Sequence, residues 1–218
     1  MIVKEILLEF GSVFDPRITT DLKKKGYKFL KKGADQQAWL EPGTGLILKI
    51  FGTTLNNQGY GRLSKAQQSF KDFADYCQKH KDNPFLPNFL GWETFYRGGE
   101  TYLQIRMERL FPFPNKYWGE WLEEMANAAW NYPNPMTWYA AEMSGQDEGD
   151  YVPGTAFSEA LPELLSHLGE DGFKLLWKTI RDLEKIADRK GYGLDLHSKN
   201  FMLGSDGHIV ISDPFFAR

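Results

Sequence analysis

Residues 191–213 read GYGLDLHSKNFMLGSDGHIVISD, and the organisation of the whole chain can be worked out from them. A polar loop leads into the apolar triplet 201–203, a Gly-Ser-Asp-Gly turn follows, and a second apolar run ends on an acid. An Asp-Gly pair between two apolar runs is a strong local signal for a β-hairpin. This hairpin would hold Asp195 and Asn200 before its first strand and Asp213 after its second, so all three would lie at the same end.

Two carboxylates and one amide at one end of a hairpin offer the hard oxygen ligands that suit Mg²⁺. A surface hairpin with ordinary turn residues remains the alternative, because short motifs carry a risk of false matches. The order and spacing of Asp195, Asn200 and Asp213 resemble those of the protein-kinase-like superfamily. The resemblance implies that Asp195 is the catalytic base and that Asn200 and Asp213 hold Mg²⁺.

The composition describes an ordinary globular chain of 218 residues, with 42% hydrophobic residues to build a core. Its net charge of −3 argues against a dedicated nucleic-acid binder, and no apolar run approaches the length of a membrane span. The single cysteine, Cys77, excludes an intrachain disulfide and fits a reducing cytosol. Acidic residues interrupt the short apolar run at the N-terminus, which does not resemble a secretory signal.

Residues 26–51 have the pattern of consecutive strands, and the last of these, 46–51, carries Lys49 inside an apolar run. A lysine there must either extend its ammonium to the surface or find an anion. By the resemblance, Lys49 is a catalytic residue that contacts the α- and β-phosphates of ATP, and the turn at Gly33 covers the phosphates. This turn keeps one glycine where the family's loop carries up to three. The alternative is that Lys49 is an edge-strand lysine.

A helix is expected from Ser64 to about Lys81, because Ser64 can cap it and apolar residues recur at helical spacing. In kinases the helix at this place carries a Glu that pairs with the strand lysine, and no Glu occurs here between Lys49 and Glu93. Three side chains could take its place: Gln67, Asp72 and Asp75.

Two further strands are predicted within 89–107, joined by a turn at 97–100. The segment that follows resembles the kinase hinge, so the resemblance implies that Met107, Glu108 and Leu110 contribute to the adenine site. The prolines at 112 and 114 mark a boundary there. We therefore expect an α+β, bilobal protein-kinase-like fold. Its N-lobe of antiparallel strands and one helix would span 1–110, and its reduced helical C-lobe 111–218.

Helices are predicted at 117–130, 159–167 and 173–190, with breaks at Gly169 and Gly172 and a stop at Gly191. Residues 131–153 are rich in Pro, Gly, Asn and Asp and read as a long loop, whose aromatic residues would contact a substrate or pin the loop to the core.

The sequence thus predicts an ATP- and Mg²⁺-dependent phosphotransferase, with a serine/threonine protein kinase as the leading interpretation and a protein substrate as the partner. His197, within Asp-Leu-His-x-x-Asn, favours a small-molecule kinase similar to aminoglycoside and lipopolysaccharide kinases. The single glycine of the turn and the missing helix Glu favour a third interpretation, a catalytically dead pseudokinase acting as a binding module. The short chain is similar in length to minimal kinases injected by enterobacterial pathogens and to compact phage proteins. A cytoplasmic location, including that of a host cell, follows as an expectation.

Overall fold

The computed structural model describes residues 14–33, 36–52, 62–114, 116–132, 134–144 and 155–217. Contacts between Cα atoms divide the chain into two compact units. The first comprises residues 1–82 and 87–109 with Ala217, and the second comprises 83–86 and 110–216 with residue 218. The predicted lobe boundary at 110/111 stays a prediction.

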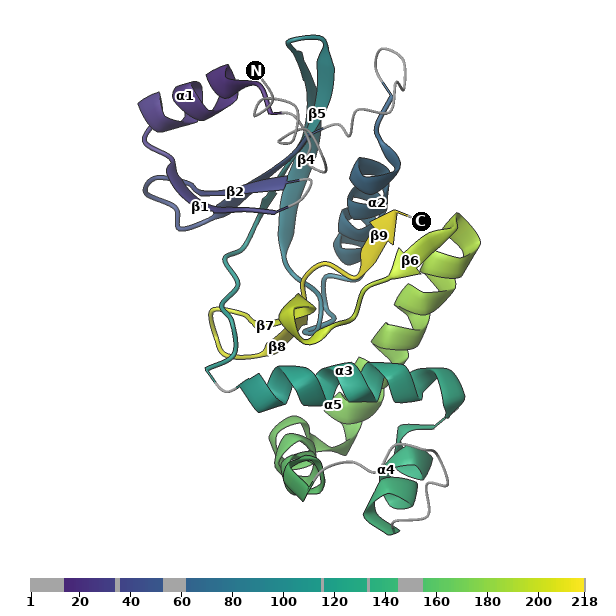
Figure 1. Cartoon of the computed structure of the whole chain (residues 1–218). Coiled ribbons are helices and arrows are strands. Elements are labelled where there is room, and N and C mark those ends of the chain that lie inside the picture. The colour runs from purple at the N-terminus through teal and green to yellow at the C-terminus, as the bar shows by residue number, and fades with distance from the viewer. Residues whose placement is uncertain are drawn as a thin grey trace, which may run out of the picture. The chain divides into compact units, whose positions relative to one another are not determined.

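The first unit is built on one five-stranded antiparallel sheet with strand order β1-β2-β3-β5-β4 (Figure 1). Its elements are helix α1 (Pro16–Lys24), β1 (Lys28–Lys32), β2 (Gln36–Leu40), β3 (Ile47–Phe51), helix α2 (Lys65–Lys79), β4 (Phe89–Arg97) and β5 (Glu100–Met107). The strands predicted within 26–51 and 89–107 are therefore confirmed.

Strand β3 is apolar on both faces because a helix covers each face. Leu48 and Ile50 point to one side, where they join a core cluster with Ile18 and Leu22 of α1. On the other side the ring of Phe51 packs on Phe70 of α2, with ring centroids 4.5 Å apart. Side chains alternate between the faces of a strand, so Lys49 lies on the same face as Phe51.

Helix α2 begins where the sequence predicts, and its first turn fastens it to the sheet. Ser64 and Gln67 form a capping box, in which each side chain satisfies a backbone N–H of the other residue. The fully buried amide of Gln67 also donates to the carbonyl oxygens of Phe51 and Thr101, at 3.1 and 2.9 Å. Gln67 thus joins helix α2 to strands β3 and β5.

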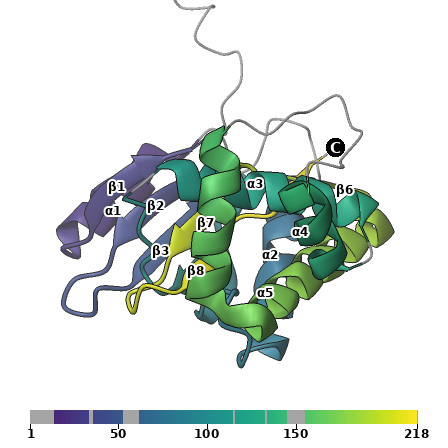
Figure 2. The same cartoon turned by 90° about the horizontal axis from the view of Figure 1, so that it is seen from below.

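The second unit is mainly helical, with α3 (Lys116–Asn131), α4 (Pro135–Ser144) and α5 (Thr155–Lys190), which Figure 2 shows from below. Helix α5 contains one non-helical residue, Gly169, with φ 67° and ψ 167°. The predicted break at Gly169 is confirmed, whereas the predicted break at Gly172 is wrong, because Gly172 lies within helix. Gly191, at φ 68°, ends α5 as expected.

The prediction of a loop over 131–153 is wrong for residues 135–144, which form helix α4. Asn134 caps this helix, since its Oδ1 accepts the N–H of Met136 at 2.8 Å, and Pro135 occupies the first helical position. The indole of Trp138 is 2% exposed and lies 5.5 Å from the ring of Trp177 on α5. Burial of Trp138 therefore stabilises a helix in a segment whose polar composition predicts a loop. Residues 145–154 lie outside the described residues.

Two small sheets complete the second unit. Strands β7 (Phe201–Leu203) and β8 (Ile209–Ile211) form the predicted antiparallel hairpin, and β6 (Tyr192–Leu194) pairs with β9 (Phe215–Ala217). Phe111 is joined to Leu203 by two backbone hydrogen bonds of 2.8 and 2.7 Å. This bridge fixes the beginning of the second unit to the hairpin.

The structure confirms a mixed α+β fold with one five-stranded antiparallel sheet and several helices. Among the residues that the structure describes, none of the helices combines the length and apolar character that crossing a membrane requires.

Candidate functional site

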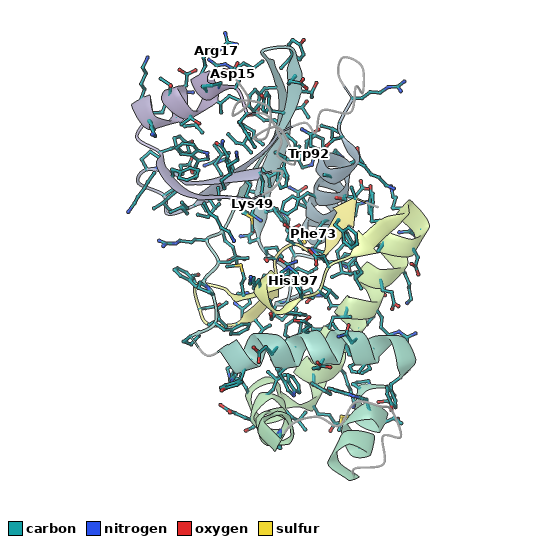
Figure 3. The ribbon with its side chains drawn as sticks, viewed as in Figure 1. Asp15, Arg17, Lys49, Phe73, Trp92 and His197 are labelled. Carbon is teal, nitrogen blue, oxygen red and sulfur yellow. The ribbon has the colours of Figure 1, made fainter. Side chains whose placement is uncertain are left out.

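The candidate site is the loop 195–200, which joins β6 to β7 and carries His197 (Figure 3). Residues Ser198–Asn200 form a single 3₁₀ turn, which His197 caps. The His197 Nδ1 accepts the N–H of Lys199 at 3.1 Å, and the His197 carbonyl accepts the N–H of Asn200 at 2.8 Å. The loop therefore has a defined conformation that places Asp195 before the turn and Asn200 at its end.

Hydrogen bonds join Asp195, Asn200 and the two neighbours of Asp213 at one end of the β7–β8 hairpin. The Asn200 amide nitrogen donates to the Asp195 carbonyl at 2.7 Å, and the Asn200 carbonyl accepts the Ser212 N–H at 2.8 Å. The Asp195 N–H donates to the Pro214 carbonyl at 2.7 Å. Asp213 lies between Ser212 and Pro214, so the structure brings Asp195, Asn200 and Asp213 together at the end predicted from the sequence.

The donor set at this end fits Mg²⁺ bound together with phosphates. The Asn200 amide uses its nitrogen on the Asp195 carbonyl, so its Oδ1 is the atom suited to a cation. Mg²⁺ commonly takes one or two protein carboxylates and completes its octahedron with substrate phosphates and water. Asn200 and Asp213 are the two residues that would supply such a partial shell. The described residues contain no group of three or more His, Cys, Asp or Glu residues that would hold a metal ion without such help.

His197 orients its proton toward Asp195. Because Nδ1 accepts the Lys199 N–H, the neutral imidazole carries its proton on Nε2. Nε2 lies 3.7 Å from the Asp195 Oδ1, which is too long for a hydrogen bond. The side chains of both residues are about two-fifths exposed, at 43% and 39%. Asp195 is thus accessible to a molecule arriving from solvent.

Asp195 lies in the wall of a pocket of about 360 Å³ within the second unit. This volume is at the lower end of the range for small-molecule sites, about 300–1,000 Å³. The pocket is lined from α3, α5, the loop and β9 by Glu123, Ala126, Asn127, Ile180, Glu184, Leu194, Asp195, Leu196, His197 and Phe216. Partial burial raises the pKa of Glu184 above its ordinary value, and nearby Asp188 adds to the effect while Arg181 opposes it.

Helix α3 holds the loop by a contact that the sequence analysis missed. The Glu123 Oε2 accepts the Ser198 N–H at 2.8 Å. One turn earlier, a Cβ added at Gly119 would lie 2.9 Å from the Ser198 carbonyl oxygen, so glycine permits this close approach. A glycine in a helix interior lowers the stability of the helix by up to about 1 kcal/mol relative to alanine. A glycine inside the helix predicted at 117–130 therefore indicates a packing role, and this is the signal that could have identified Gly119.

The predicted residue Lys49 lies in the first unit. Its cross-strand neighbours on β2 and β5 are Ala38 and Ile105, and its ammonium lies 4.6 Å from the centroid of the Phe70 ring. The side chain is therefore half-buried on an apolar face, with a cation–π contact to α2.

The three candidates for the missing helix Glu are all engaged in hydrogen bonds. Gln67 joins the helix to the sheet, as described above. Asp75 pairs with Lys71 at 2.7 Å and accepts the Trp92 indole N–H at 2.8 Å, whereas Asp72 accepts the Gln68 amide at 2.8 Å.

Three of the four remaining predicted residues lie in the first unit. The Gly33 N–H closes the β1–β2 turn on the Gln36 carbonyl at 2.8 Å. Met107 ends β5 and is 2% exposed. Glu108 follows it and exchanges hydrogen bonds with the backbone of Asn88, donating its N–H at 3.0 Å and accepting at Oε1 at 2.7 Å. Leu110, half-buried, begins the main part of the second unit.

Comparison of the chain with protein-family models finds no match, and comparison with curated protein sequences finds none either.

Proposed function

We propose that the chain is an ATP- and Mg²⁺-dependent phosphotransferase with a bilobal protein-kinase-like fold. The observation that carries the proposal is the convergence of Asp195, Asn200 and Asp213 at one end of the β7–β8 hairpin. The order of elements also supports the proposal. An antiparallel sheet with one inserted helix is followed by a helical unit that ends in this loop and hairpin, as the resemblance to the protein-kinase-like superfamily implies.

Phosphoryl transfer asks the protein for positioning and electrostatic stabilisation. In the proposed reaction Asp195 accepts the proton of the attacking hydroxyl, and its backbone is fixed on both sides by Asn200 and Pro214. Asn200 and Asp213 would hold Mg²⁺, which would neutralise phosphate charge. Lys49 contacts the α- and β-phosphates, and the half-burial of its stem restricts where the ammonium can lie.

The resemblance also assigns nucleotide-binding roles to residues of the first unit and to the segment that follows it. The turn at Gly33 covers the phosphates, and backbone groups from Met107 to Leu110 bind adenine. The Glu108 N–H donates to the Asn88 carbonyl, so carbonyl groups and the Leu110 N–H are the hinge atoms we assign to adenine.

The leading acceptor is a serine or threonine hydroxyl of a protein partner, in the cytoplasm of the cell or of a host. A small hydroxyl-bearing molecule is the second candidate. It is favoured by the pocket of about 360 Å³ in whose wall Asp195 lies, and by His197 beside Asp195.

Paired substitutions at the hairpin end test the proposal. Asp195→Asn leaves both metal ligands in place, so nucleotide binding should survive while transfer falls by roughly 10²–10⁴-fold, as for loss of a general base. Asp213→Asn removes charge from the metal shell, so Mg²⁺-dependent nucleotide binding should weaken. Labelled ATP, scored on the protein itself, on lysate proteins and on small molecules, measures transfer, and calorimetry measures binding.

Equal transfer by wild type and Asp195→Asn would refute the catalytic assignment. Nucleotide binding without transfer to any acceptor would instead favour the pseudokinase interpretation.

A further inference from the structure

Phe216 and Gly193 form a matched pair beside the pocket of Asp195. Strands β6 and β9 pair, and the Phe216 ring lies directly over Gly193. A Cβ built at Gly193 would stand 2.1–2.6 Å from three atoms of this ring, far inside van der Waals contact. The ring can occupy its position only because residue 193 is glycine.

The two aromatic residues of β9 have different surroundings. Phe215 is 6% exposed, and its ring lies 5.8 Å from the ring of Tyr192, so it anchors the strand in the core. Phe216, on the opposite face, is 47% exposed and lines the pocket together with Leu194 and Asp195. Because about half of the Phe216 side chain stays exposed, its burial contributes less to stability than that of Phe215.

We propose that Phe216 is the specificity-determining residue of the Asp195 pocket: its ring, seated on Gly193, is a wall that limits the size of the acceptor reaching Asp195. The exposed ring face offers a surface on which a flat, apolar face of a ligand can stack. This favours the second candidate acceptor of the proposed function, a compact hydroxyl-bearing compound with one apolar face, such as a sugar-like or aromatic ring. The role of the pocket as an acceptor site rests on the proposed function, whereas the wall itself does not.

Because the chain has a single cysteine, access to the pocket past Phe216 can be measured by thiol labelling, without any assay of phosphate transfer. Cys77 is 2% exposed, and burial raises the pKa of its thiol well above the ordinary value, so it reacts slowly. Ala126→Cys introduces a second thiol inside the pocket, since Ala126 lines it and is 7% exposed. The rate at which this thiol reacts with iodoacetamide then reports the access of small molecules to the pocket. The rate with a bulky fluorescein maleimide reports the access of large ones.

In the Ala126→Cys background, Phe216→Ala should raise the rate with the bulky reagent, relative to iodoacetamide, by about tenfold. Gly193→Ala should also change that ratio, because the added methyl displaces the ring. Leu175→Ala, which removes a side chain of similar exposure from α5 outside the pocket, should leave the ratio unchanged.

Asn127→Cys, on the exposed part of the lining, is the reporter if Ala126→Cys unfolds the chain. Unchanged ratios in both Phe216→Ala and Gly193→Ala would overturn the proposal.

Transfer assays with hydroxyl acceptors of graded size separate this inference from the proposed function. If wild type transfers phosphate, Phe216→Ala should shift the preference toward larger acceptors and leave the KM for ATP unchanged. If Phe216→Ala transfers phosphate with the same preference for acceptor size as wild type, the role of Phe216 is overturned and the phosphotransferase proposal is retained. If the substitutions change thiol access but the chain transfers no phosphate, the phosphotransferase proposal is refuted and the role of Phe216 as a wall of the pocket is retained.

Discussion

At the scale of single residues, the candidate loop is fixed by contacts from several directions. The Asn200 amide and the Pro214 carbonyl hold Asp195 from within the hairpin region. Glu123 of α3 holds Ser198 from a helix that lies 75 residues away in sequence. Several such bonds on a six-residue loop restrict the directions in which Asp195 can point, which is the preorganisation that a positioned base requires.

Glu123 is expected to act as a positioning residue. Glu123→Ala removes the acceptor of the Ser198 N–H, so amide hydrogen exchange at Ser198 should speed up by roughly 5–10-fold, the effect of about one lost hydrogen bond. Glu123→Gln keeps a side-chain oxygen and should retain most of the protection. The measurement is residue-resolved exchange by NMR at constant pH. Equal exchange in wild type, Glu123→Ala and Glu123→Gln would show that Glu123 does not hold the loop.

Asp15 should make stability depend on pH at the start of α1. It caps α1 by accepting the Arg17 N–H at 2.9 Å, and Figure 3 labels both residues. Its side-chain hydrogen bonds to Arg17 lower the pKa of Asp15 from 3.8 to about 2, and the nearby Arg97 adds to the effect. A lowered pKa in the folded state means that the carboxylate stabilises the fold. This contribution is complete above pH 3.8 and is lost as the pH falls through about 2.

Asp15→Asn keeps a capping oxygen and removes the charge. Its melting temperature should therefore be below that of wild type at pH 6, and the difference should shrink as the pH falls from 4 toward 2. A difference that stays constant over this range would show that the charge of Asp15 does not contribute.

At the scale of elements, helix α5 shows how one residue divides a helix. Gly169 has φ 67° and ψ 167°, a region of backbone conformation that residues with a Cβ rarely adopt. Gly172, three residues later, has helical geometry, and a Cβ there would meet the Leu168 Cβ at 3.4 Å, an ordinary contact. The two glycines read alike in the sequence and differ in the structure.

Alanine substitutions at these glycines should have opposite signs. Gly169→Ala should lower the free energy of unfolding by about 1–3 kcal/mol, because alanine is strained at this conformation. Gly172→Ala should raise it by up to about 1 kcal/mol, because alanine favours helix over glycine. Urea denaturation followed by circular dichroism measures both. If Gly169→Ala is as stable as wild type, the kink does not depend on glycine.

At the scale of the whole molecule, each of the two units has its own core. In the first, two helices cover opposite faces of one sheet, and in the second, three helices gather around buried aromatic residues, among them Trp138 and Trp177. A ligand that binds the folded chain and not the unfolded one stabilises it by mass action.

ATP with Mg²⁺ should therefore raise the melting temperature of the chain, with a stabilisation of about 2.7 kcal/mol at a hundredfold excess over Kd. Lys49→Met should reduce the shift without unfolding the protein, because methionine fills the apolar part of the lysine site. Lys24→Met, an exposed change on α1, is the matched control and should leave the shift intact. Absence of a shift in wild type at millimolar nucleotide would contradict the ATP assignment.

Much of the architecture could be predicted because its signals are local. The Gly-Ser-Asp-Gly turn between apolar runs specified the β7–β8 hairpin, and with it the placement of Asn200 and Asp213 at one end. Ser64 specified the start of α2, since a cap acts within one helical turn. Helix α4 shows the limit of this reasoning. The Asn134-Pro135 cap is a local signal for a helix, but the polar composition around it favours a loop, and the burial of Trp138 decides for the helix.

Other features arise only in the tertiary structure, because they join residues far apart in the chain. Neither the bond from Ser198 to Glu123 nor the seat of Phe216 on Gly193 follows from a periodicity or a turn motif. The contact of Lys49 with Phe70 likewise depends on how α2 packs on the sheet. The sequence alone determines most of the segments that become helix, strand or turn, since those choices depend largely on neighbours a few residues away. Helix α4 is the exception, because it also depends on the burial of Trp138. Packing between segments decides which side chains meet around Asp195.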